Sequence, residues 1–136
     1  MSSETQVVDG LVSRVECEQI LHRLMMNIDR FQSLENLDYF TEDVSYKAAG
    51  WGEAHGHEEL RGGLVARDAM KDRHTMNVVA GFDFTLQSAD EASAVGNYLR
   101  WVAGESEPAV MRYKAIFVRK GGTWKVRDWL ATGFPA

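Results

Sequence analysis

Residues 109–133, AVMRYKAIFVRKGGTWKVRDWLATG, read as two long β-strands joined at Gly121-Gly122. Apolar and polar residues alternate on both sides of the glycine pair, which is the period of a strand with one buried face, and paired glycines favour a tight hairpin. The same alternation begins earlier, in MNVVAGFDFTL (76–86) and ASAVGNYLRWVAG (92–104), which the turn SADE separates. The sequence therefore predicts an antiparallel meander of four strands in the second half of the chain.

Helical patterns dominate the first half of the chain. Residues 14–31, RVECEQILHRLMMNIDRF, place apolar side chains at the i, i+3, i+4 spacing of an amphipathic helix. LENLDYF (34–40) indicates a short second helix with Ser33 as its N-cap, and residues 57–71 indicate a third. Residues 41–50 read as an extended strand. This order predicts an α+β domain in which a strongly curved sheet wraps the helices.

Two features of the predicted helices involve small side chains. Cys17 is the single cysteine and falls among the apolar positions of the first helix, so we expect a small core residue. Gly62-Gly63 lies inside the third helix, where each glycine costs roughly 1 kcal/mol relative to alanine. The pair therefore indicates close packing against the backbone of that helix.

The composition narrows the class of protein. At 136 residues, 45% hydrophobic and 26% charged, the chain fits one globular domain, with residues 1–12 as a flexible N-terminal segment. A net charge of −5 without a dense Lys/Arg block gives no electrostatic footprint for nucleic acid or for an anionic membrane. Neither a secretory leader nor a membrane span is visible, so we expect a soluble, cytoplasmic protein.

Four stretches of the chain carry a family resemblance: NIDR (27–30), YFTEDVSY (39–46), AHGHEEL (54–60) and VRKGGTWKVRDW (118–129). They resemble the nuclear transport factor 2-like superfamily, in its SnoaL-type branch of polyketide cyclases and scytalone dehydratase-like proteins. The resemblance implies a single SnoaL-like domain over residues 1–136, with a cone-shaped, curved antiparallel sheet wrapped around N-terminal helices and a pocket between sheet and first helix. It is specific for the fold and weak for the reaction, because the superfamily holds enzymes and non-enzymes alike.

The resemblance also implies a set of catalytic residues. Several enzymes of the branch pair an aspartate at the end of the first helix with a histidine base on a later strand, assisted by a tyrosine of the first strand. Asp29 matches the aspartate and Tyr46 the tyrosine, but the position of the base falls on Asn77, and His74 lies three residues earlier. An odd offset puts two side chains of a regular strand on opposite faces. Either a β-bulge returns His74 to the pocket, or an amide replaces the imidazole and the proton goes to Asp29 itself.

A second acid/base candidate lies in the last strand. In WKVRDWL, strict alternation puts Asp128 on the same face as Trp124 and Val126. If that face is buried, the Asp128 carboxylate needs a partner, for which Arg100 or Arg112 on neighbouring strands, or a pocket group such as His74, are candidates. Asp128 is thus either a pocket residue or a member of a structural ion pair.

Aromatic and thioether side chains are plentiful enough to line an apolar pocket. The candidates for the lining are Trp51, Tyr39, Tyr98, Met25 and Met76, and ordinary core packing accounts for such residues equally well. In the pocket, Tyr46 and Asn77 are candidates to steady a developing oxyanion. On the outer face of the sheet, Trp101 or Trp129 with Phe117 predicts a surface covered by another subunit, and hence a homo-oligomer, dimer or trimer.

No metal or cofactor is expected. His55 and His57 lie in the turn-rich stretch GWGEAHGH (50–57), where their spacing could serve a metal, but no third ligand has a recognisable spacing and Gly56 indicates a turn. The chain lacks a glycine-rich phosphate loop, a zinc framework, a nucleotide fingerprint and a nucleophile elbow. An enzyme built on this sequence is therefore expected to work without a cofactor.

These observations lead to one principal functional hypothesis and two alternatives. The principal one is a cofactor-independent lyase, dehydratase or isomerase that abstracts a proton from a small apolar, aromatic or polycyclic substrate, with Asp29, His74 and Tyr46 as catalytic residues. The first alternative is a non-catalytic small-molecule-binding or partner-subunit domain, resembling the β subunit of ring-hydroxylating dioxygenases. The second is an epoxide-opening hydrolase, which would need Asp128 and an arginine in the pocket.

Overall fold

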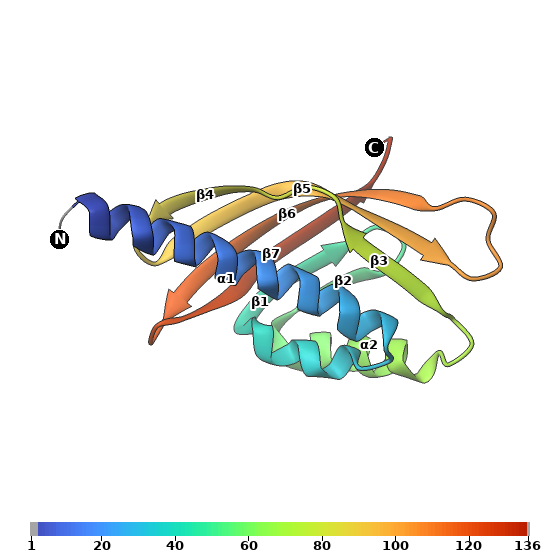
Figure 1. Cartoon of the computed structure of the whole chain (residues 1–136). Helices are drawn as coiled ribbons and strands as arrows, with labels where there is room; N and C mark the ends of the chain where they lie inside the picture. Colours follow the sequence, from blue (N-terminus) through green and yellow to red (C-terminus); the bar gives the residue numbers. More distant parts are fainter. Residues whose placement is uncertain (1–2, 136) are drawn as a thin grey trace.

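The computed structural model describes residues 3–135, in which two α-helices and a 3-10 helix pack against one curved sheet (Figure 1). In chain order the elements are α1 (Ser3–Asp29), the 3-10 helix η1 (Ser33–Tyr39), β1 (Phe40–Ala48), β2 (Gly52–His55), α2 (Gly56–Ala69), β3 (Thr75–Val79), β4 (Asp83–Ser88), β5 (Glu91–Val102), β6 (Ala109–Lys120) and β7 (Thr123–Gly133). No helix within residues 3–135 is both long enough and apolar enough to span a membrane.

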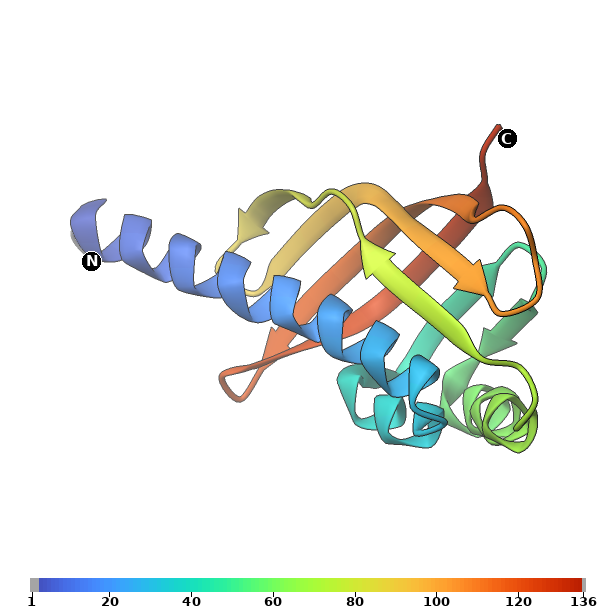
Figure 2. The ribbon, with the colours of Figure 1, turned by 45° about the vertical axis from the view of Figure 1, so that its right-hand side comes forward.

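The sheet has the strand order β2-β1-β7-β6-β5-β3, and β4 also pairs with β5. The predicted meander is confirmed, because β3 and β4, β5, β6 and β7 pair antiparallel in succession. One pairing departs from the expected antiparallel sheet: β1 joins β7 in parallel, so the sheet is mixed. Figure 2 shows α1 running along the sheet, with η1 and α2 gathered at the end where β1 and β2 lie.

The core lies between α1 and the inner face of the sheet. Its largest side chains that are less than 2% exposed come from the helices and from the strands β1, β6 and β7, and include Leu21, Leu60, Val44, Phe117 and Val126. Cys17 is fully buried among them, as expected. Burial raises the pKa of the Cys17 thiol from 9.0 to about 12, so the group stays a protonated, apolar core side chain.

Helix α1 begins at Ser3, earlier than the spacing of apolar residues indicated. Residues 3–12, expected to form a flexible segment, are the first turns of this helix, and they extend past the sheet in Figure 1; residues 1–2 lie outside the described part. Asp9 secures this portion through two contacts with the Arg119 guanidinium of β6, at 3.1 and 3.2 Å. The pKa of Asp9 is lowered chiefly by that hydrogen bond.

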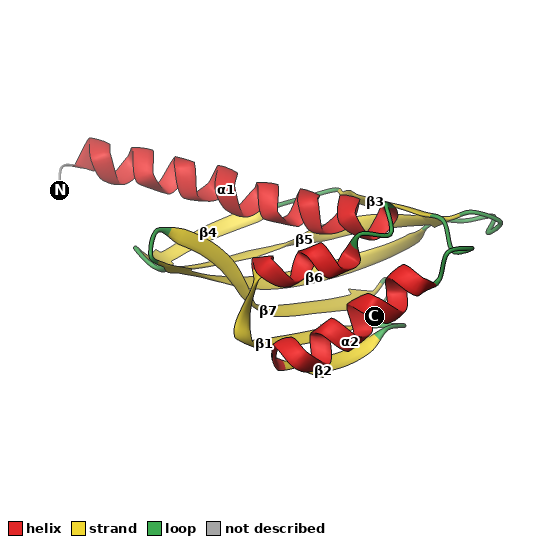
Figure 3. Cartoon of the chain, turned by 90° about the horizontal axis from the view of Figure 1, so that it is seen from below, coloured by secondary structure: helices red, strands yellow, loops and turns green. Residues whose placement is uncertain are grey.

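The second helix differs from the prediction at its start. Ser33 does not cap it; instead the Asp68 carboxylate of α2 accepts hydrogen bonds from the backbone N–H groups of Ser33 (2.7 Å) and Leu34 (3.0 Å). An aspartate distant in sequence thus satisfies the orphan donors that a local cap usually takes. Figure 3, the view from below, shows η1 and α2 side by side in front of the sheet, as these two bonds require.

The strand predicted over residues 76–86 is broken in the middle. Residues 80–82 separate β3 from β4, although both pair with β5. At the break the chain crosses close to Gly96, where a Cβ atom would lie 2.8 Å from the Tyr113 hydroxyl, and that hydroxyl donates to the Gly81 carbonyl at 2.5 Å. A second difference is that GWGEAHGH, read as a turn, contains the short strand β2.

A β-bulge in β7 reverses the alternation predicted for the last strand. Ile116 pairs with Asp128 and Phe117 with Val126, so Arg127 is an extra residue on the β7 side. Trp124 and Val126 face inward as expected, but after the bulge Trp129 is buried and Asp128 turns outward. Trp129, expected on the outer face, is therefore a core residue. Phe117, also expected there, is buried because it shares the inner face of β6 with Tyr113 and Ala115, and Trp101 remains exposed on the outer face.

Candidate functional site

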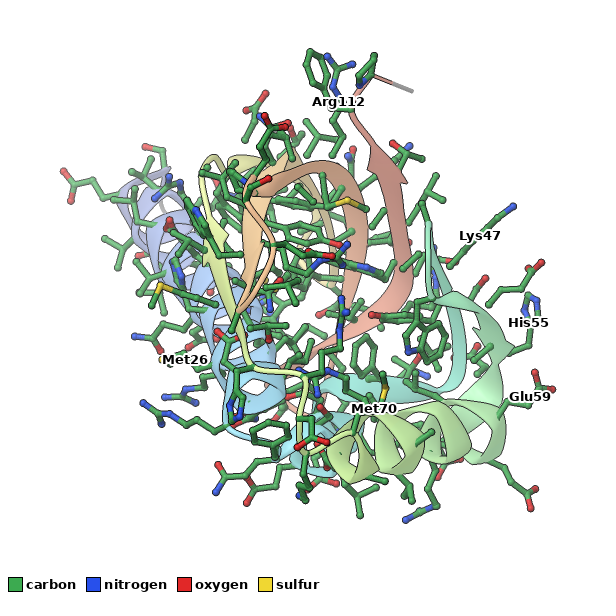
Figure 4. All side chains as sticks on the ribbon, turned by 90° about the vertical axis from the view of Figure 1, so that its right-hand side faces the viewer. Met26, Lys47, His55, Glu59, Met70 and Arg112 are labelled. Carbon is green, nitrogen blue, oxygen red and sulfur yellow. The ribbon has the colours of Figure 1, made fainter. Side chains whose placement is uncertain are left out.

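A cavity of about 550 Å³ lies between the inner face of the sheet, the end of α1 and helix α2. Figure 4 looks at this end of the molecule, with Met70 at the end of α2. Met70 lines the cavity and is 51% exposed, so the cavity opens to solvent beside it. Its wall combines four aromatic side chains, Tyr46, Trp51, Tyr98 and Trp129, with polar side chains from α2, β3 and β5.

Asp29, the last residue of α1, is held against this wall by three hydrogen bonds. Its Oδ1 accepts from the Thr75 hydroxyl at 2.8 Å and from Asn77 Nδ2 at 2.7 Å, and its Oδ2 accepts from the Asn77 backbone N–H at 2.9 Å. Thr75 and Asn77 line the cavity, whereas Asp29 itself does not. Asp29 is therefore separated from the cavity by the two β3 side chains that it binds, Thr75 and Asn77.

The register of β3 decides between His74 and Asn77. β3 pairs without a bulge, from Thr75 opposite Val102 to Val79 opposite Tyr98. Regular alternation puts Asn77 inward, 9% exposed, and leaves His74 exposed at the entrance to the strand.

The surroundings of His74 agree with this register. Its ring packs edge-on to Phe31 at 5.4 Å, and among residues 3–135 it makes neither a hydrogen bond nor an ion pair with Asp29. Of the two possibilities, the structure thus has an amide in the place of the imidazole, and the expected Asp–His dyad is not formed.

The aromatic wall is organised around Tyr46. The ring of Tyr46 contacts Trp51 edge-on at 4.8 Å and stacks over Trp129 at 6.4 Å, and Tyr98 lies 6.1 Å from Trp129. Burial is the main cause that raises the pKa of both Tyr46 and Tyr98, so both phenols remain protonated well above neutral pH. Protonated phenols on a cavity wall can donate hydrogen bonds to a bound molecule.

Of the other predicted residues, Met25 and Asn77 line the cavity. Tyr39 packs against the core and is not part of the lining, and Met76 is wrong as a lining residue, since it is 61% exposed on the opposite face of β3. Asp128 is also outside, because the bulge turns it outward, where Arg127 Nε donates to it at 2.8 Å and its side chain is 43% exposed. The arginine partner expected for Asp128 thus exists, but it is the preceding residue.

His55 and His57 do not gather in the cavity. His55 projects away from the molecule in Figure 4 and lies 3.4 Å from the exposed Glu53, and the His57 ring contacts the Phe40 carbonyl at 2.8 Å. Within residues 3–135 no group of three or more His, Cys, Asp or Glu side chains is arranged to hold a metal ion.

Two arginines of the wall were missed as pocket residues, although the sequence carries a signal for each. Arg100 follows Tyr98 by two positions on β5, so strand alternation puts both on one face. Arg67 continues the buried stripe of Leu60 and Leu64 at helical spacing and is only 9% exposed. Charged side chains are rarely buried, so a search for apolar residues at regular spacing does not identify Arg67 and Arg100 as pocket residues.

Sequence comparison identifies a family. The model of the SnoaL-like domain matches residues 9–129 of this chain. No curated protein sequence matches the chain significantly.

Solved structures share the fold over most of the chain. A type 2 hexachlorocyclohexane dehydrochlorinase (LinA) has a TM-score of 0.79 at 18% identity, with 93% of this chain and 88% of that chain covered. A candidate scytalone dehydratase from Novosphingobium aromaticivorans has a TM-score of 0.81 at 18% identity, with 93% and 87% covered. The type 3 LinA of Novosphingobium barchaimii has a TM-score of 0.77 at 18% identity, with 93% and 90% covered. At this level of identity the likeness establishes the fold alone.

Proposed function

The chain belongs to the SnoaL-like domain family, and from this premise we propose that it is a cofactor-independent lyase or isomerase that abstracts a proton from a small organic molecule in the cavity. The neighbours of the same fold include dehydrochlorinases and a candidate dehydratase, names that denote elimination reactions. The cavity of about 550 Å³ and its aromatic wall suit a small, flat, largely apolar substrate.

The observation that carries the proposal is the way Asp29 is held. An ionised carboxylate offers about four lone-pair sites. Three of them accept the hydrogen bonds from Thr75 and Asn77, so one acceptor site remains, on Oδ2. Asp29 lies directly behind Thr75 and Asn77, which line the cavity, so in this proposal the substrate reaches past these two side chains and gives its proton to the remaining site. The three bonds keep the carboxylate in a fixed orientation.

Tyr46 and Asn77 complete the proposed mechanism. Because burial raises the pKa of Tyr46, its hydroxyl keeps its proton and can donate to an oxygen that gains charge as the C–H bond breaks. Asn77 Nδ2 donates to Asp29 at 2.7 Å and to the Thr75 hydroxyl at 3.5 Å, so its part in the proposal is to orient the carboxylate. His74 is exposed, packs on Phe31 and has no hydrogen bond with Asp29 in the described part of the chain, so the proposal gives it no part in proton transfer.

Proton abstraction can be tested even when the product is not identified. The protein is incubated in D2O with a panel of small aromatic and alicyclic ketones and acids, and deuterium in the recovered compounds is measured by mass spectrometry. We expect uptake that Asp29→Asn lowers by roughly 100-fold or more, the usual contribution of a positioned base. Uptake that persists in Asp29→Asn would overturn the role of this carboxylate.

One observation favours a second candidate, a non-catalytic small-molecule-binding or partner-subunit domain. Asn77 occupies the strand position of the base, and an amide cannot accept the proton. Saturable binding of compounds in the cavity without deuterium uptake into any of them would support this candidate. An epoxide-opening hydrolase loses its support, because the Asp128 carboxylate that it requires lies on the outer side of the bulge.

We also propose a cytoplasmic homo-oligomer, dimer or trimer. The outer face of the sheet exposes large apolar side chains, among them Met76, Trp101 and Leu130 at 61%, 41% and 42%. The projecting turns of α1 expose Val7 and Leu11 at 61% and 60%. Apolar surface of this extent is commonly covered by another subunit.

A further inference from the structure

Four buried polar groups without hydrogen-bond partners belong to residues that line the cavity. They are Ser33 Oγ, Arg67 Nη1, Arg100 Nε and Trp129 Nε1, each buried and without a hydrogen-bond partner among the described residues, and all four residues line the cavity. Buried polar groups in native proteins are nearly always satisfied, so four such groups in the lining of one cavity call for an explanation. The three nitrogen groups can only donate and the hydroxyl can donate as well, so a molecule that carries acceptor oxygens is the partner that suits all four.

Arg67 is the most deeply buried of the charged donors. Its side chain comes from α2 and is 9% exposed. Nη2 donates to the Arg73 carbonyl and to the Thr75 hydroxyl, both at 3.1 Å, which fixes the plane of the guanidinium and leaves Nη1 without a partner in residues 3–135. A buried cation that is held in place with one unused donor edge is suited to receive an anion.

Arg100 adds a second cation to the same wall. It is directly opposite Asn77 in the β3–β5 ladder and two residues from Tyr98, so the three side chains share the inner face. Arg73 also lines the cavity. Neither Arg67 nor Arg100 forms an ion pair within 4.0 Å of a carboxylate in the part of the chain that the structure describes.

Two carboxylates interact electrostatically with Arg67, those of Asp29 and Asp68, and Asp68 is bound to the backbone N–H groups of Ser33 and Leu34. Asp29 is linked to Arg67 only through the Thr75 hydroxyl, which donates to Asp29 and accepts from Arg67. The other acidic residues of the lining, Glu53 and Glu59, are exposed at the opposite side, on β2 and α2, and Glu59 points outward in Figure 4. The inner part of the cavity therefore carries an excess of positive charge.

We propose that the cavity binds a small carboxylic acid as its anion, with the carboxylate oxygens on Arg67 and Arg100 and the apolar body against Tyr46, Tyr98 and Trp129. The planar guanidinium group matches the geometry of a carboxylate, and the aromatic wall matches a flat hydrocarbon body. The inference rests on the cavity of the proposed function and names the class of its substrate.

The test compares benzoate with benzamide, a neutral molecule of nearly the same shape, by isothermal titration calorimetry on the full-length chain. We expect saturable benzoate binding, with benzamide weaker by roughly 10-fold or more, since hydrogen bonds to charged groups are the stronger ones. Arg100→Gln should weaken benzoate to a similar extent and leave benzamide nearly unchanged. Equal affinities for the two probes, or no saturable benzoate binding in the millimolar range, would overturn the proposal.

Further variants separate this site from general effects of charge and folding. Arg112→Gln is the matched control, because Arg112 is exposed, packs on the Phe134 ring at 4.8 Å and stands away from the cavity in Figure 4. It should bind benzoate as the unmodified protein does. Arg67→Gln should lose benzoate affinity in the same way as Arg100→Gln, and thermal unfolding checks that it is folded. Loss of benzoate affinity in Arg112→Gln equal to that in Arg100→Gln would contradict a specific site.

The proposal and the proposed function can fail separately. Asp29→Asn removes a negative charge near Arg67 and should bind benzoate at least as tightly as the unmodified protein. Benzoate binding that depends on Arg100, together with deuterium uptake that ignores Asp29→Asn, would leave the anion site standing and refute the lyase or isomerase. Deuterium uptake that depends on Asp29 but occurs only in neutral compounds, together with equal affinities for benzoate and benzamide, would support the lyase or isomerase and refute the anion site.

Discussion

Replacing Gly63 by alanine should disturb the aromatic wall of the cavity, while the same change at Gly62 should only stabilise helix α2. A Cβ atom at Gly63 would lie 2.2 Å from Cζ2 and 2.7 Å from Cη2 of Trp51, which is too close for the ring to stay in place. A Cβ atom at Gly62 meets no atom within 4 Å. The two variants add the same methyl group at neighbouring positions of α2, and only in Gly63→Ala does that group meet Trp51.

The size of the effect follows from two opposing contributions. Each glycine-to-alanine change inside a helix gains about 1 kcal/mol in the free energy of unfolding. In Gly63→Ala this gain is offset, because Trp51 is 38% exposed and can swing outward, where it loses its edge-on contact with Tyr46 at 4.8 Å. Such an aromatic pair is worth about 0.5–1.5 kcal/mol beyond its buried area. Gly62→Ala should therefore be more stable than Gly63→Ala by about 1 kcal/mol.

Urea denaturation of both variants gives the difference in stability, and tryptophan emission reports the position of Trp51. We expect Gly63→Ala to shift emission to longer wavelength and to change the affinity for a cavity ligand, since Trp51 lines the cavity. Gly62→Ala should change neither. Equal stabilisation of the two variants with identical emission spectra would refute the packing of Trp51 on α2.

Three further predictions concern stability and assembly. Because burial raises the pKa of Cys17 from 9.0 to about 12, its thiol should not react with a disulfide reagent at pH 8 until urea unfolds the protein. Between pH 9 and 12 the unfolded thiol ionises and the folded one does not, so the free energy of unfolding should fall as pH rises. Rapid reaction of the native protein would contradict the burial of Cys17. Asp68→Ala should lower the free energy of unfolding, measured by urea denaturation, by about 1–2 kcal/mol, because it removes the acceptor of the N–H groups of Ser33 and Leu34. Asp72→Ala, at an exposed position, should leave it nearly unchanged, and equal effects of the two changes would argue against the cap. Light scattering coupled to size exclusion should show a dimer or trimer, and a monomer at micromolar concentration would refute the covered sheet face.

The sequence predicts most of the architecture because periodicity is a local property. The meander, the inward face of α1 from Cys17 to Met25, and the position of Asp29 at the end of that helix all follow from spacing, and the structure has them as expected. The parallel pairing of β1 with β7 could not be found in this way, because it joins strands that are far apart along the chain. For the same reason the cap on η1, which comes from Asp68, has no local signal.

The site could be predicted only where strands alternate regularly. A bulge in β3 would have brought His74 inward, but β3 is regular and the bulge lies at Arg127 in β7. A single extra residue reverses which side chains face inward, so it exchanged Asp128 for Trp129 on the inner face. Arg67 could not be predicted as a cavity residue, because a charged side chain in an apolar stripe of a helix is expected to reach solvent. Only the fold shows that it lines the cavity.

The central claim is that the chemistry of the cavity rests on the Asp29 carboxylate, with Asn77 and without His74. The rate of deuterium uptake into a responsive compound, measured in parallel for Asp29→Asn and His74→Asn, tests this claim most directly. We predict a loss of roughly 100-fold or more in Asp29→Asn. In His74→Asn the rate should be unchanged, because that side chain is exposed, packs on Phe31 and, among the residues described, makes no hydrogen bond with Asp29. A large loss in His74→Asn, or full activity in Asp29→Asn, would contradict the claim.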